Sequence, residues 1–360
     1  MSLLQKIRKK FQIKRDEVLK SIGDDCAVIK GLNKPILVTT DSLNEGVHFD
    51  RSYTSAYTLG FKTVSVNISD IFATGGQPLA IFLSLSFPKD TEETFFWDFY
   101  EGIEYALKIY KLDLLGGDLC ESLRNISICA TVIGFSDKPV YRNGAKVGDL
   151  ICVTGSLGDS SLGFKILNSL DENYKYLFSK IKKNKNIDDK EVYILKEGKK
   201  ISLNTQSIMP FVNRHLMPIA RNSKEISPIA TSMIDISDGL FIDLFRVCDE
   251  SKVGAMIFTQ KLPILKEMKG LAEILREDPL KLATTGGEDF ELLFTIPKGS
   301  FLPEKTDYEI TVIGEVIPEG LYLVDDKGQK SRIQPKGYEH FSAKFLQNRK
   351  HLSHRITEII

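Results

Sequence analysis

The chain has 360 residues, of which 42% are hydrophobic and 27% are charged. This length favours two domains, each large enough to bury an apolar core. Because lysine plus arginine and aspartate plus glutamate number 48 each, no net charge indicates a nucleic acid or an anionic membrane as a partner.

The N-terminal segment 1–17 predicts a short basic helix, since it lacks the long apolar core of a secretory signal. No segment approaches the roughly 20 apolar residues of a membrane span. The five cysteines show no CxxC spacing, and three of them lie in apolar strand-like runs. Such cysteines are typical of a reducing cytoplasm, which is the location that we expect.

Apolar runs alternate with helical patterns along the chain, which favours an α/β or α+β architecture. Strand-like runs occupy residues 35–41, 78–88, 112–118, 126–135, 150–155 and 290–297. Helical patterns occupy 55–76 and 238–251, and the second places its apolar side chains on one stripe. The turn-rich segment 136–149 separates two strand-like runs, so we predict one domain over 1–137 and another over 138–360.

Between residues 179 and 200, lysines alternate with acidic residues. We interpret this segment as a solvated and mobile surface excursion rather than as a phosphate-binding patch.

Acidic residues recur at the ends of apolar runs, usually close to glycine. They are Asp24, Asp25, Asp41, Asp70, Asp118, Asp235, Asp238, Glu288 and Asp289. Apolar flanks anchor each carboxylate to a core, and glycine lets the backbone approach a ligand. A single acid in such a place is usually a turn or cap residue. Several of them gathered together would repel one another strongly without a cation.

Hard oxygen ligands, with few histidines and no cysteine pairs, select Mg²⁺, Ca²⁺ or Mn²⁺ over zinc. Mg²⁺ is generally held by a few carboxylates plus substrate phosphates, so several acids indicate several ions and a polyphosphate. The P-loop, Rossmann, protein-kinase and GxSxG motifs are absent. Four of the five histidines lack a paired acid or a nucleophile motif, namely His215, His340, His351 and His354.

Nine motifs follow one another along the chain. They are IGDDCAVI, TTDSLNEGVHF, VNISDIFATGGQP, GGD, RNGAKVGDLICVTGSLGDS, RHLMP, IDISDGL, TGGEDFELLFTIP and KGYEHF. They occur in the order expected of the thiamine-monophosphate kinase family. The chain resembles this family from about residue 23 to residue 341. The family belongs to a superfamily with aminoimidazole ribonucleotide synthetase, selenophosphate synthetase and a hydrogenase maturation factor.

The resemblance implies two α/β domains, with the N-terminal sheet forming a barrel together with the sheet of a second subunit in a homodimer. It also implies the transfer of a phosphoryl group from ATP to thiamine phosphate, which gives thiamine diphosphate. The segment 171–205 is longer than usual in the family and is expected to be a surface insertion.

The resemblance also assigns roles to residues. The implied Mg²⁺ ligands are Asp25, Thr39, Thr40, Asp41, Asp70, Asp118, Asp235 and Asp238. The implied nucleotide contacts are Tyr100, Gly117, Asp118, Arg142 and Ser237, and the implied thiamine-phosphate contacts are His48, Glu288 and Tyr338. Where the family has a Thr-rich turn after GGD, this chain has Leu119, Cys120 and Glu121, which leaves the nucleotide contacts past Asp118 open.

The implied acceptor is an ionised phosphate oxygen, so the transfer needs no general base and depends on in-line alignment and charge neutralisation. Arg142 would add a fork of donors to a phosphate. One alternative is a sister ATP-dependent reaction of the superfamily, although Cys26 lies in GDDCA rather than in a Gly-rich segment, and the chain ends without a cysteine. The other alternative is a catalytically silent protein that binds nucleotide or Mg²⁺.

Overall fold

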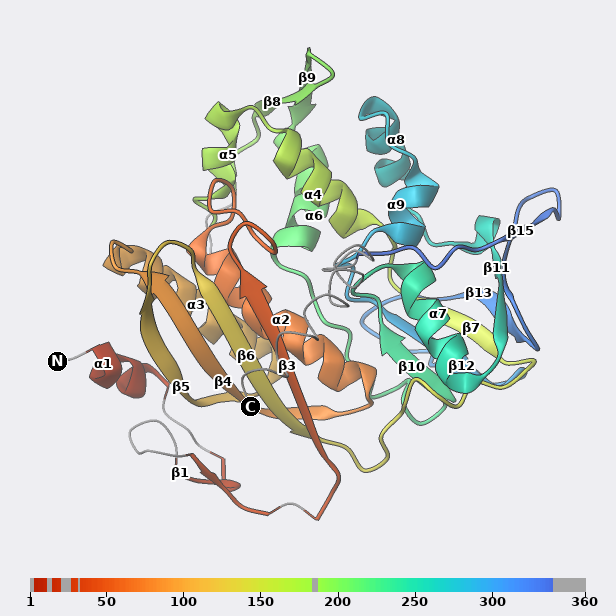
Figure 1. Ribbon diagram of the computed structural model, residues 1–360, viewed down its shortest axis with the longest axis horizontal. Coiled ribbons are helices and arrows are strands. Elements are labelled where there is room, and N and C mark those ends of the chain that lie inside the picture. Colours follow the sequence, from red (N-terminus) through yellow and green to blue (C-terminus); the bar gives the residue numbers. More distant parts are fainter. Residues whose placement is uncertain (1–2, 12–14, 21–26, 32, 183–186, 339–360) are drawn as a thin grey trace, which may run out of the picture.

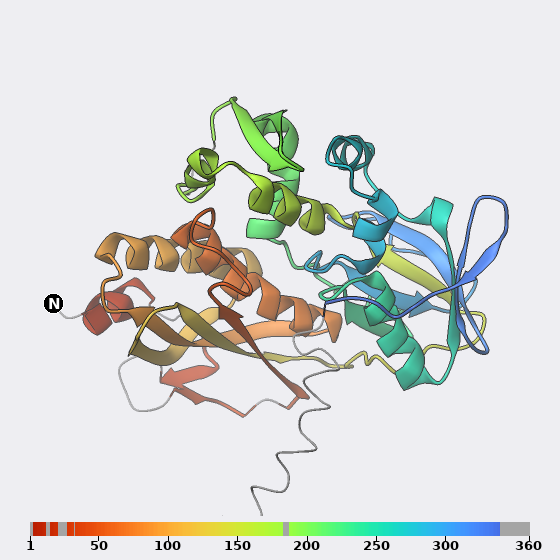
Figure 2. The same ribbon diagram turned by 45° about the horizontal axis from the view of Figure 1, so that its top comes forward.

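The computed structural model describes residues 3–11, 15–20, 27–31, 33–182 and 187–338. The predicted ligand Asp25 lies outside these residues. Two sheets lie side by side, and a group of helices lies above both of them in two different views (Figures 1 and 2). Within the described residues, no helix is both long enough and apolar enough to cross a membrane.

The first sheet has four strands in the order β3-β6-β4-β5. Their bounds are Ile36–Asn44 for β3, Gln77–Pro88 for β4, Asp113–Ser122 for β5 and Ser127–Phe135 for β6. The β3-β6 and β6-β4 pairs are antiparallel, whereas β4 and β5 are parallel. A parallel pair needs a crossover connection, and α3 (Glu93–Tyr110) supplies it.

Helix α2 (Ala56–Ala73) covers one face of this sheet together with α3. Its N-cap residue Ser55 accepts a hydrogen bond from the backbone N–H of Thr58, which satisfies one of the free donors of the first turn. The two helices cross closely because each has a glycine there. A Cβ atom on Gly60 would lie 2.0 Å from the carbonyl oxygen of Phe99, and one on Gly102 would lie 1.9 Å from that of Tyr57.

The second sheet has seven strands in the order β10-β12-β7-β13-β11-β14-β15. Their bounds are Leu150–Thr154 (β7), Ser232–Asp235 (β10), Gly254–Phe258 (β11), Leu292–Ile296 (β12), Ile310–Ile317 (β13), Leu321–Val324 (β14) and Lys330–Arg332 (β15). Only β11 and β14 pair in parallel among these strands. Helix α7 (Leu240–Ser251) packs on the sheet through Leu240, Leu244 and Val247.

Four further helices and a short 3-10 turn belong to this half of the chain. They are α4 (Asp159–Ser169), α6 (Thr205–Leu216), α8 (Lys266–Ile274), α9 (Pro279–Thr285) and η1 (Thr259–Lys261). At the other end of the chain lie α1 (Leu3–Lys10) and the antiparallel pair β1 (Val18–Lys20) and β2 (Val28–Ile29). The predicted boundary between residues 137 and 138 falls between β6 and β7, which belong to different sheets.

The sequence predicts that the segment near 179–200 is solvated and mobile. Most of its described lysines are exposed, but the expectation of a mobile excursion is wrong where the segment forms regular structure. Helix α5 (Glu172–Phe178) is followed by a hairpin of β8 (Glu191–Lys196) and β9 (Lys199–Asn204). The side chains of Phe178, Val192 and Ile194 are completely buried in one core with residues of α4 and α6. The lysines and acids had suggested solvation, but the apolar residues between them anchor the hairpin.

All six predicted strands and the two helices predicted at 55–76 and 238–251 are present, with ends that shift by up to four residues. The short basic helix predicted within 1–17 is also present, as α1. The strand-like runs of the first half became β3 to β6, and the later two became β7 and β12. The predictions did not include the short strands β1, β2, β10 and β11, the hairpin β8-β9 or the strands β13 to β15.

Candidate active site

The candidate site starts at β3, where alternate side chains point to opposite faces of the sheet. Thr39 and Asp41 lie opposite Val132 and Ala130 of β6, which are buried beneath α2. The Thr39 hydroxyl donates a hydrogen bond of 2.5 Å to Asp70 Oδ2 on α2. The backbone N–H of Asp41 donates one of 3.1 Å to Asn67 Oδ1. Strand and helix therefore place Asp41 and Asp70 on the same side of the sheet.

Helix α2 also links Asp41 and Asp70 to the second sheet. Ser69 Oγ donates a hydrogen bond of 2.7 Å to Oδ2 of Asp235, the last residue of β10. Asp238 follows in the loop before α7, where Arg246 Nη2 lies 2.7 Å from its carboxylate. The backbone N–H groups of Asp238 and Gly239 both donate to Asp243, which fixes the loop at the helix start.

The four carboxylates of Asp41, Asp70, Asp235 and Asp238, which we call the aspartate cluster, act on one another electrostatically. Desolvation, followed by the charges of Asp70 and Asp238, raises the pKa of Asp41 to about 6. Burial, followed by the charge of Asp70, raises the pKa of Asp235 well above its usual value. Burial and like charges held close together both raise the pKa of a carboxyl group.

Burial also raises the pKa of Asp70, although the Thr39 hydroxyl and the charge of Arg142 oppose this rise. Arg142 lies in the segment between the two sheets, and its carbonyl accepts a hydrogen bond of 3.2 Å from Ser251 Oγ. The structure thus brings Arg142 within electrostatic reach of the aspartate cluster. It is the one predicted nucleotide contact whose charge acts directly on a predicted Mg²⁺ ligand.

The donor chemistry of the aspartate cluster fits a hard divalent cation. Within the described ranges, no three His, Cys, Asp or Glu side chains are arranged so that they could hold an ion by themselves. Mg²⁺ usually keeps several waters and completes its shell with substrate phosphates, so a looser set of carboxylates suits it. Burial and the charges of neighbouring acids together raise the pKa values of Asp41 and Asp235, and a bound cation would offset the repulsion between the acids.

Four of the predicted site residues lie away from the aspartate cluster within one chain: Asp118, Thr40, Gly117 and Tyr100. Asp118 opposes Ser84 of β4, which opposes Cys129 of β6, which opposes Ser42 of β3. At roughly 4.8 Å per strand, Asp118 is about 14 Å from β3. The side chain of Asp118 lies on the same face of the sheet as that of Ser42, whereas Asp41 points to the opposite face.

Thr40 points to that same face, because Thr131, its partner in β6, donates a hydrogen bond of 3.2 Å to its hydroxyl. Gly117 lies against β4, where a Cβ atom would be 2.0 Å from the carbonyl oxygen of Leu83, so strand packing alone explains this glycine. Tyr100 is 5% exposed in the core under α3, with its ring against Phe96 and Phe99. Burial raises the pKa of its hydroxyl.

The predicted substrate contacts Glu288 and Tyr338 both lie against the loop 236–239. The backbone N–H of Glu288 donates to the carbonyl of Ser237 at 2.7 Å, and that of Tyr338 donates to the carbonyl of Asp238 at 3.0 Å. Ser237, a predicted nucleotide contact, thus lies between the aspartate cluster and Glu288. Glu288 and Tyr338 thus meet at the loop 236–239, which the resemblance did not indicate.

His48 lies just beyond the end of β3, and its Nδ1 accepts a hydrogen bond of 3.0 Å from the backbone N–H of Asn44. The chain then runs past Asp50 to Tyr53. Burial raises the pKa of the Tyr53 hydroxyl, and the charges of Asp50 and Glu288 raise it further. This segment therefore reaches the surroundings of Glu288, although Tyr53 is itself buried.

A network of buried charges anchors the loop that carries Glu288. Asp289 accepts hydrogen bonds from the backbone N–H groups of Gly158 and Ser160 at the start of α4. The completely buried Glu291 pairs with Arg221 at 2.7 Å and with Arg214. Buried carboxylates need such partners, so Asp289 and Glu291 hold the loop rather than the substrate.

The prediction that His215 lacks a paired acid is wrong. His215 Nδ1 lies 3.1 Å from Glu288 Oε2, and Lys62 Nζ lies 2.9 Å from Glu288 Oε1. These residues are separated by more than 70 positions in the sequence, so no local motif could have revealed the contact. The one available signal was a lysine within the strongly apolar run of α2.

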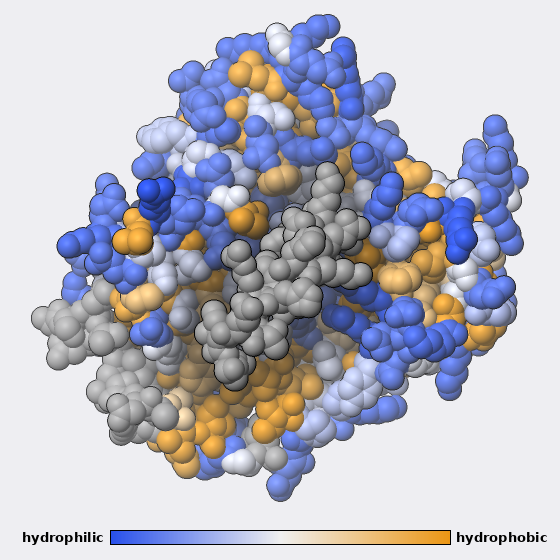
Figure 3. Space-filling model, viewed as in Figure 1, coloured by the Kyte–Doolittle hydropathy of each residue, from blue (hydrophilic) through white to orange (hydrophobic). Residues whose placement is uncertain are grey.

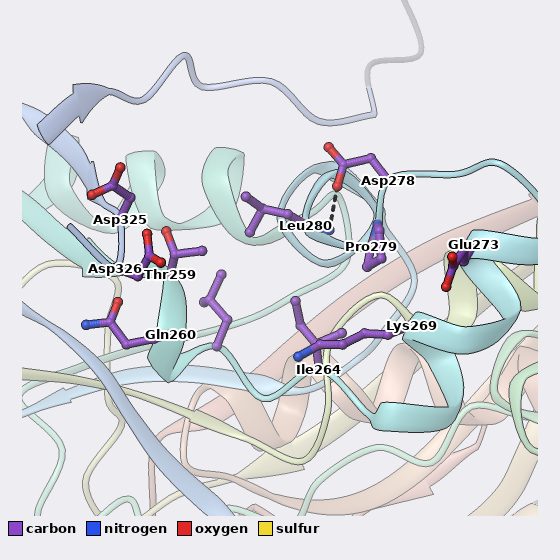
Figure 4. A pocket seen from close by; sticks show the side chains of 11 residues that line it. Thr259, Gln260, Ile264, Lys269, Glu273, Asp278, Pro279, Leu280, Asp325 and Asp326 are labelled. Carbon is purple, nitrogen blue, oxygen red and sulfur yellow. Dashed lines mark hydrogen bonds between the residues drawn. The ribbon is translucent and has the colours of Figure 1, made fainter. Parts of the chain in front are cut away.

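A separate groove of about 540 Å³ lies beside η1, α8 and α9 (Figure 4). None of the predicted site residues line it. Asp278, one of its acids, caps α9 by accepting a hydrogen bond from the backbone N–H of Leu280. Asp325 likewise accepts from the backbone of Lys327 and Gln329. Both carboxylates are explained by local structure, so the groove does not compete with the aspartate cluster.

Comparisons with known proteins show the family to which the chain belongs. Residues 23–136 match the model for the AIR synthase related protein, N-terminal domain. A curated thiamine-monophosphate kinase of Aquifex aeolicus is 37% identical over 331 residues, which is 91% of this chain and 95% of that protein.

Two solved structures are similar over most of their length. One is described as AaThiL complexed with AMPPCP and TMP; it is 34% identical, with a TM-score of 0.70, and the match covers 94% of this chain and 96% of that one. The other is thiamine-monophosphate kinase from Stenotrophomonas maltophilia, at 28% identity and a TM-score of 0.74, covering 92% and 97%. On its motifs, its fold and these relatives, the chain belongs to the thiamine-monophosphate kinase family.

Proposed function

We propose that this protein phosphorylates thiamine phosphate with ATP, that Mg²⁺ ions held by the aspartate cluster assist the transfer, and that the working form is a homodimer. The observation that carries the proposal is the convergence of Asp41 and Asp70 with Asp235 and Asp238, which come from two different sheets and the helix between them. A related structure bound to AMPPCP and TMP supports both substrates.

The aspartate cluster would hold the metal ions through carboxylate oxygens, with Thr39 beside them. When bound, Mg²⁺ supplies positive charge that lets two polyanionic substrates approach and offsets the charge that develops on the transferred group. The phosphate oxygens of the substrates would complete the coordination. This choice of ion follows from the hard oxygen donors and from the absence of cysteine or histidine in the cluster.

The side chains of the chain itself bind and orient the substrates. The guanidinium of Arg142 would donate to a phosphate oxygen of the nucleotide. His48, Glu288 and Tyr338 would bind thiamine phosphate. No side chain has to remove a proton, because the acceptor oxygen of thiamine phosphate is already ionised, so positioning dominates the catalysis.

The homodimer rests on the face of the first sheet that α2 and α3 leave open. Ile36 and Val38 of β3 are 55% and 66% exposed there, and Figure 3 shows apolar side chains gathered over this sheet. Exposed apolar patches of this kind mark interaction sites. Asp118 and Thr40 lie on the same face, so a second copy placed there would bring these two candidates into the assembly.

A cytoplasmic location completes the proposal. The four described cysteines, Cys120, Cys129, Cys152 and Cys248, are free thiols, which is typical of proteins in a reducing compartment.

The test is incubation with ATP, Mg²⁺ and a panel of phosphorylated acceptors, with the masses of the products measured. We expect thiamine diphosphate from thiamine phosphate, and only with a divalent metal. Full activity in excess chelator, or transfer to free thiamine but not to its phosphate, would contradict the proposal. Modification of a different acceptor would identify a sister reaction, and nucleotide binding without turnover would identify a silent binding protein.

A further inference from the structure

Lys62 is a charged residue in an apolar setting. It lies on α2, between the first sheet and the second half of the chain, and is 2% exposed. A buried ammonium group is costly unless it is paired. Among the described residues, its recorded ion pair is with Glu288 Oε1 at 2.9 Å.

His215 approaches the same carboxylate from another element. It lies near the end of α6, is 4% exposed, and places Nδ1 3.1 Å from Glu288 Oε2. Burial, followed by the charge of Lys62, lowers the pKa of His215, so the imidazole is neutral near pH 7. A neutral ring that faces a carboxylate through Nδ1 must carry its proton there, because two acceptors would repel.

Each oxygen of Glu288 thus has its own donor, and the two donors come from α2 and α6. The Glu288 side chain is nevertheless 30% exposed, whereas those of Lys62 and His215 are 3% and 4% exposed. The two partners are therefore buried, whereas part of the Glu288 side chain reaches solvent. Burial disfavours the ionised form, but Lys62 and His215 outweigh this effect and hold the pKa of Glu288 below its usual range.

The backbone keeps Glu288 in the same orientation. Its φ of +64° lies in the left-handed region, which a residue with a side chain adopts only when its surroundings enforce it. The hydrogen bond to Ser237 and the buried network around Asp289 provide that enforcement. A carboxylate held by backbone, lysine and histidine together is a preorganised acceptor.

We propose that Lys62 and His215 are positioning residues that hold the Glu288 carboxylate as a fixed hydrogen-bond acceptor for an amine donor of the thiamine moiety. This inference rests on the proposed function, because thiamine phosphate is the ligand that Glu288 would contact. Lys62 and His215 act through Glu288 and do not themselves touch the substrate.

A double-mutant cycle tests this inference, with Lys62→Met, Glu288→Gln and the double variant. We expect Lys62→Met alone to raise the KM for thiamine phosphate by roughly tenfold or more, the scale of a hydrogen bond to a charged group, while the KM for ATP changes by less than about twofold. In the Glu288→Gln background, Lys62→Met should cause no further rise, since the residue through which it acts is altered.

Two results would overturn the positioning role of Lys62. The same rise in KM in both backgrounds would mean that Lys62 contacts the substrate directly. A lower melting temperature with unchanged KM would mean that the ion pair only stabilises the fold. Because the double variant removes both charges, we expect it to recover thermal stability relative to Glu288→Gln, which leaves Lys62 without its counter-charge.

His215 has a conservative variant that provides a rescue. His215→Asn keeps an N–H donor near the position of Nδ1 and should leave the KM for thiamine phosphate within about threefold of wild type, whereas His215→Leu removes the donor and should raise it by roughly tenfold. Equal effects of Asn and Leu would contradict the role of this hydrogen bond. Wild-type turnover separately tests the proposed function, and a wild type that neither binds nor converts thiamine phosphate would overturn both proposals.

Discussion

The carboxylate of Asp41 lies within electrostatic reach of two other segments of the chain. Its own strand places it beneath α2, where Asp70 lies, and the loop after β10 brings Asp238. Asp41 is exposed to solvent, yet the packing around its carboxylate and the charges of Asp70 and Asp238 raise its pKa to about 6. A carboxylate that merely capped a turn would have the opposite tendency, because a donated hydrogen bond lowers the pKa.

The substitution Asp41→Asn should therefore separate activity from stability. We expect turnover to fall on the order of 100-fold or more, as for the loss of one preorganised group that offsets transition-state charge. Mg²⁺ with a non-hydrolysable ATP analogue should stabilise wild type more than the variant, because binding to the folded state stabilises by about 2.7 kcal/mol at roughly 100 times the Kd. Asp326→Asn, the same change in an exposed turn, is the control. An active variant with a wild-type melting shift would contradict the metal role.

Asp41 also predicts a pH dependence for the metal-free protein. Its pKa is raised from 3.8 to about 6 in the folded state, so its ionisation opposes folding above about pH 6 and this opposition is lost as the pH falls towards 3.8. In excess chelator, Asp41→Asn should melt at a higher temperature than wild type at about pH 8. The difference should narrow as the pH falls through 6, and a difference independent of pH would refute the assignment.

Arg142, His48 and Tyr338 should affect different ligands. Arg142→Ala should weaken ATP binding more than thiamine-phosphate binding, because its charge acts on Asp70 at the phosphate side of the site. His48→Ala and Tyr338→Ala should do the reverse. Separate titrations of each ligand measure the effects, and equal losses of both ligands in all three variants would count against these roles.

At the scale of elements, α2 connects most of the site. Lys62 contacts Glu288, and Asn67 accepts a hydrogen bond from the backbone of Asp41. Ser69 contacts Asp235, and Asp70 contacts Thr39. The helix can present polar groups in several directions because it is buried on nearly all sides, between the first sheet, α3 and β10. A helix on the surface would have offered only one buried stripe.

The packing of the segment 171–205 predicts how substitutions in it change the stability of the fold. Phe178 of α5 is completely buried among residues of α4 and α6, so Phe178→Ala should lower the free energy of unfolding by about 3–5 kcal/mol. Tyr176→Ala, two residues earlier at a side chain that is 59% exposed, is the matched control and should change it by less than about 0.5 kcal/mol. Urea unfolding measures both. Equal, small effects would support the mobile excursion that the charges had suggested.

At the scale of the whole molecule, the proposed homodimer would form through the open face of the first sheet. Val38 exposes 66% of its surface in the middle of β3 on this face. Val38→Asp places a charge there, which is costly to bury in an interface. We expect wild type to sediment as a dimer and the variant to sediment largely as a monomer. Phe301→Asp, at a side chain that is 94% exposed in the second half of the chain, should leave the mass unchanged. A monomeric wild type would contradict the homodimer.

The amino-acid sequence by itself determined the strands β3 to β7 and β12, the helices α2 and α7, and the family. Apolar runs of strand length and helical apolar spacing are local properties, so they can be read without knowing the fold. The ordered motifs likewise identified Asp41, Asp70, Asp235 and Asp238. Only the tertiary structure decided that these four converge while Asp118 and Tyr100 do not, because strand order and the face of each side chain depend on pairing. The same holds for Lys62, Glu288 and His215, which meet through contacts between distant segments that no local pattern encodes.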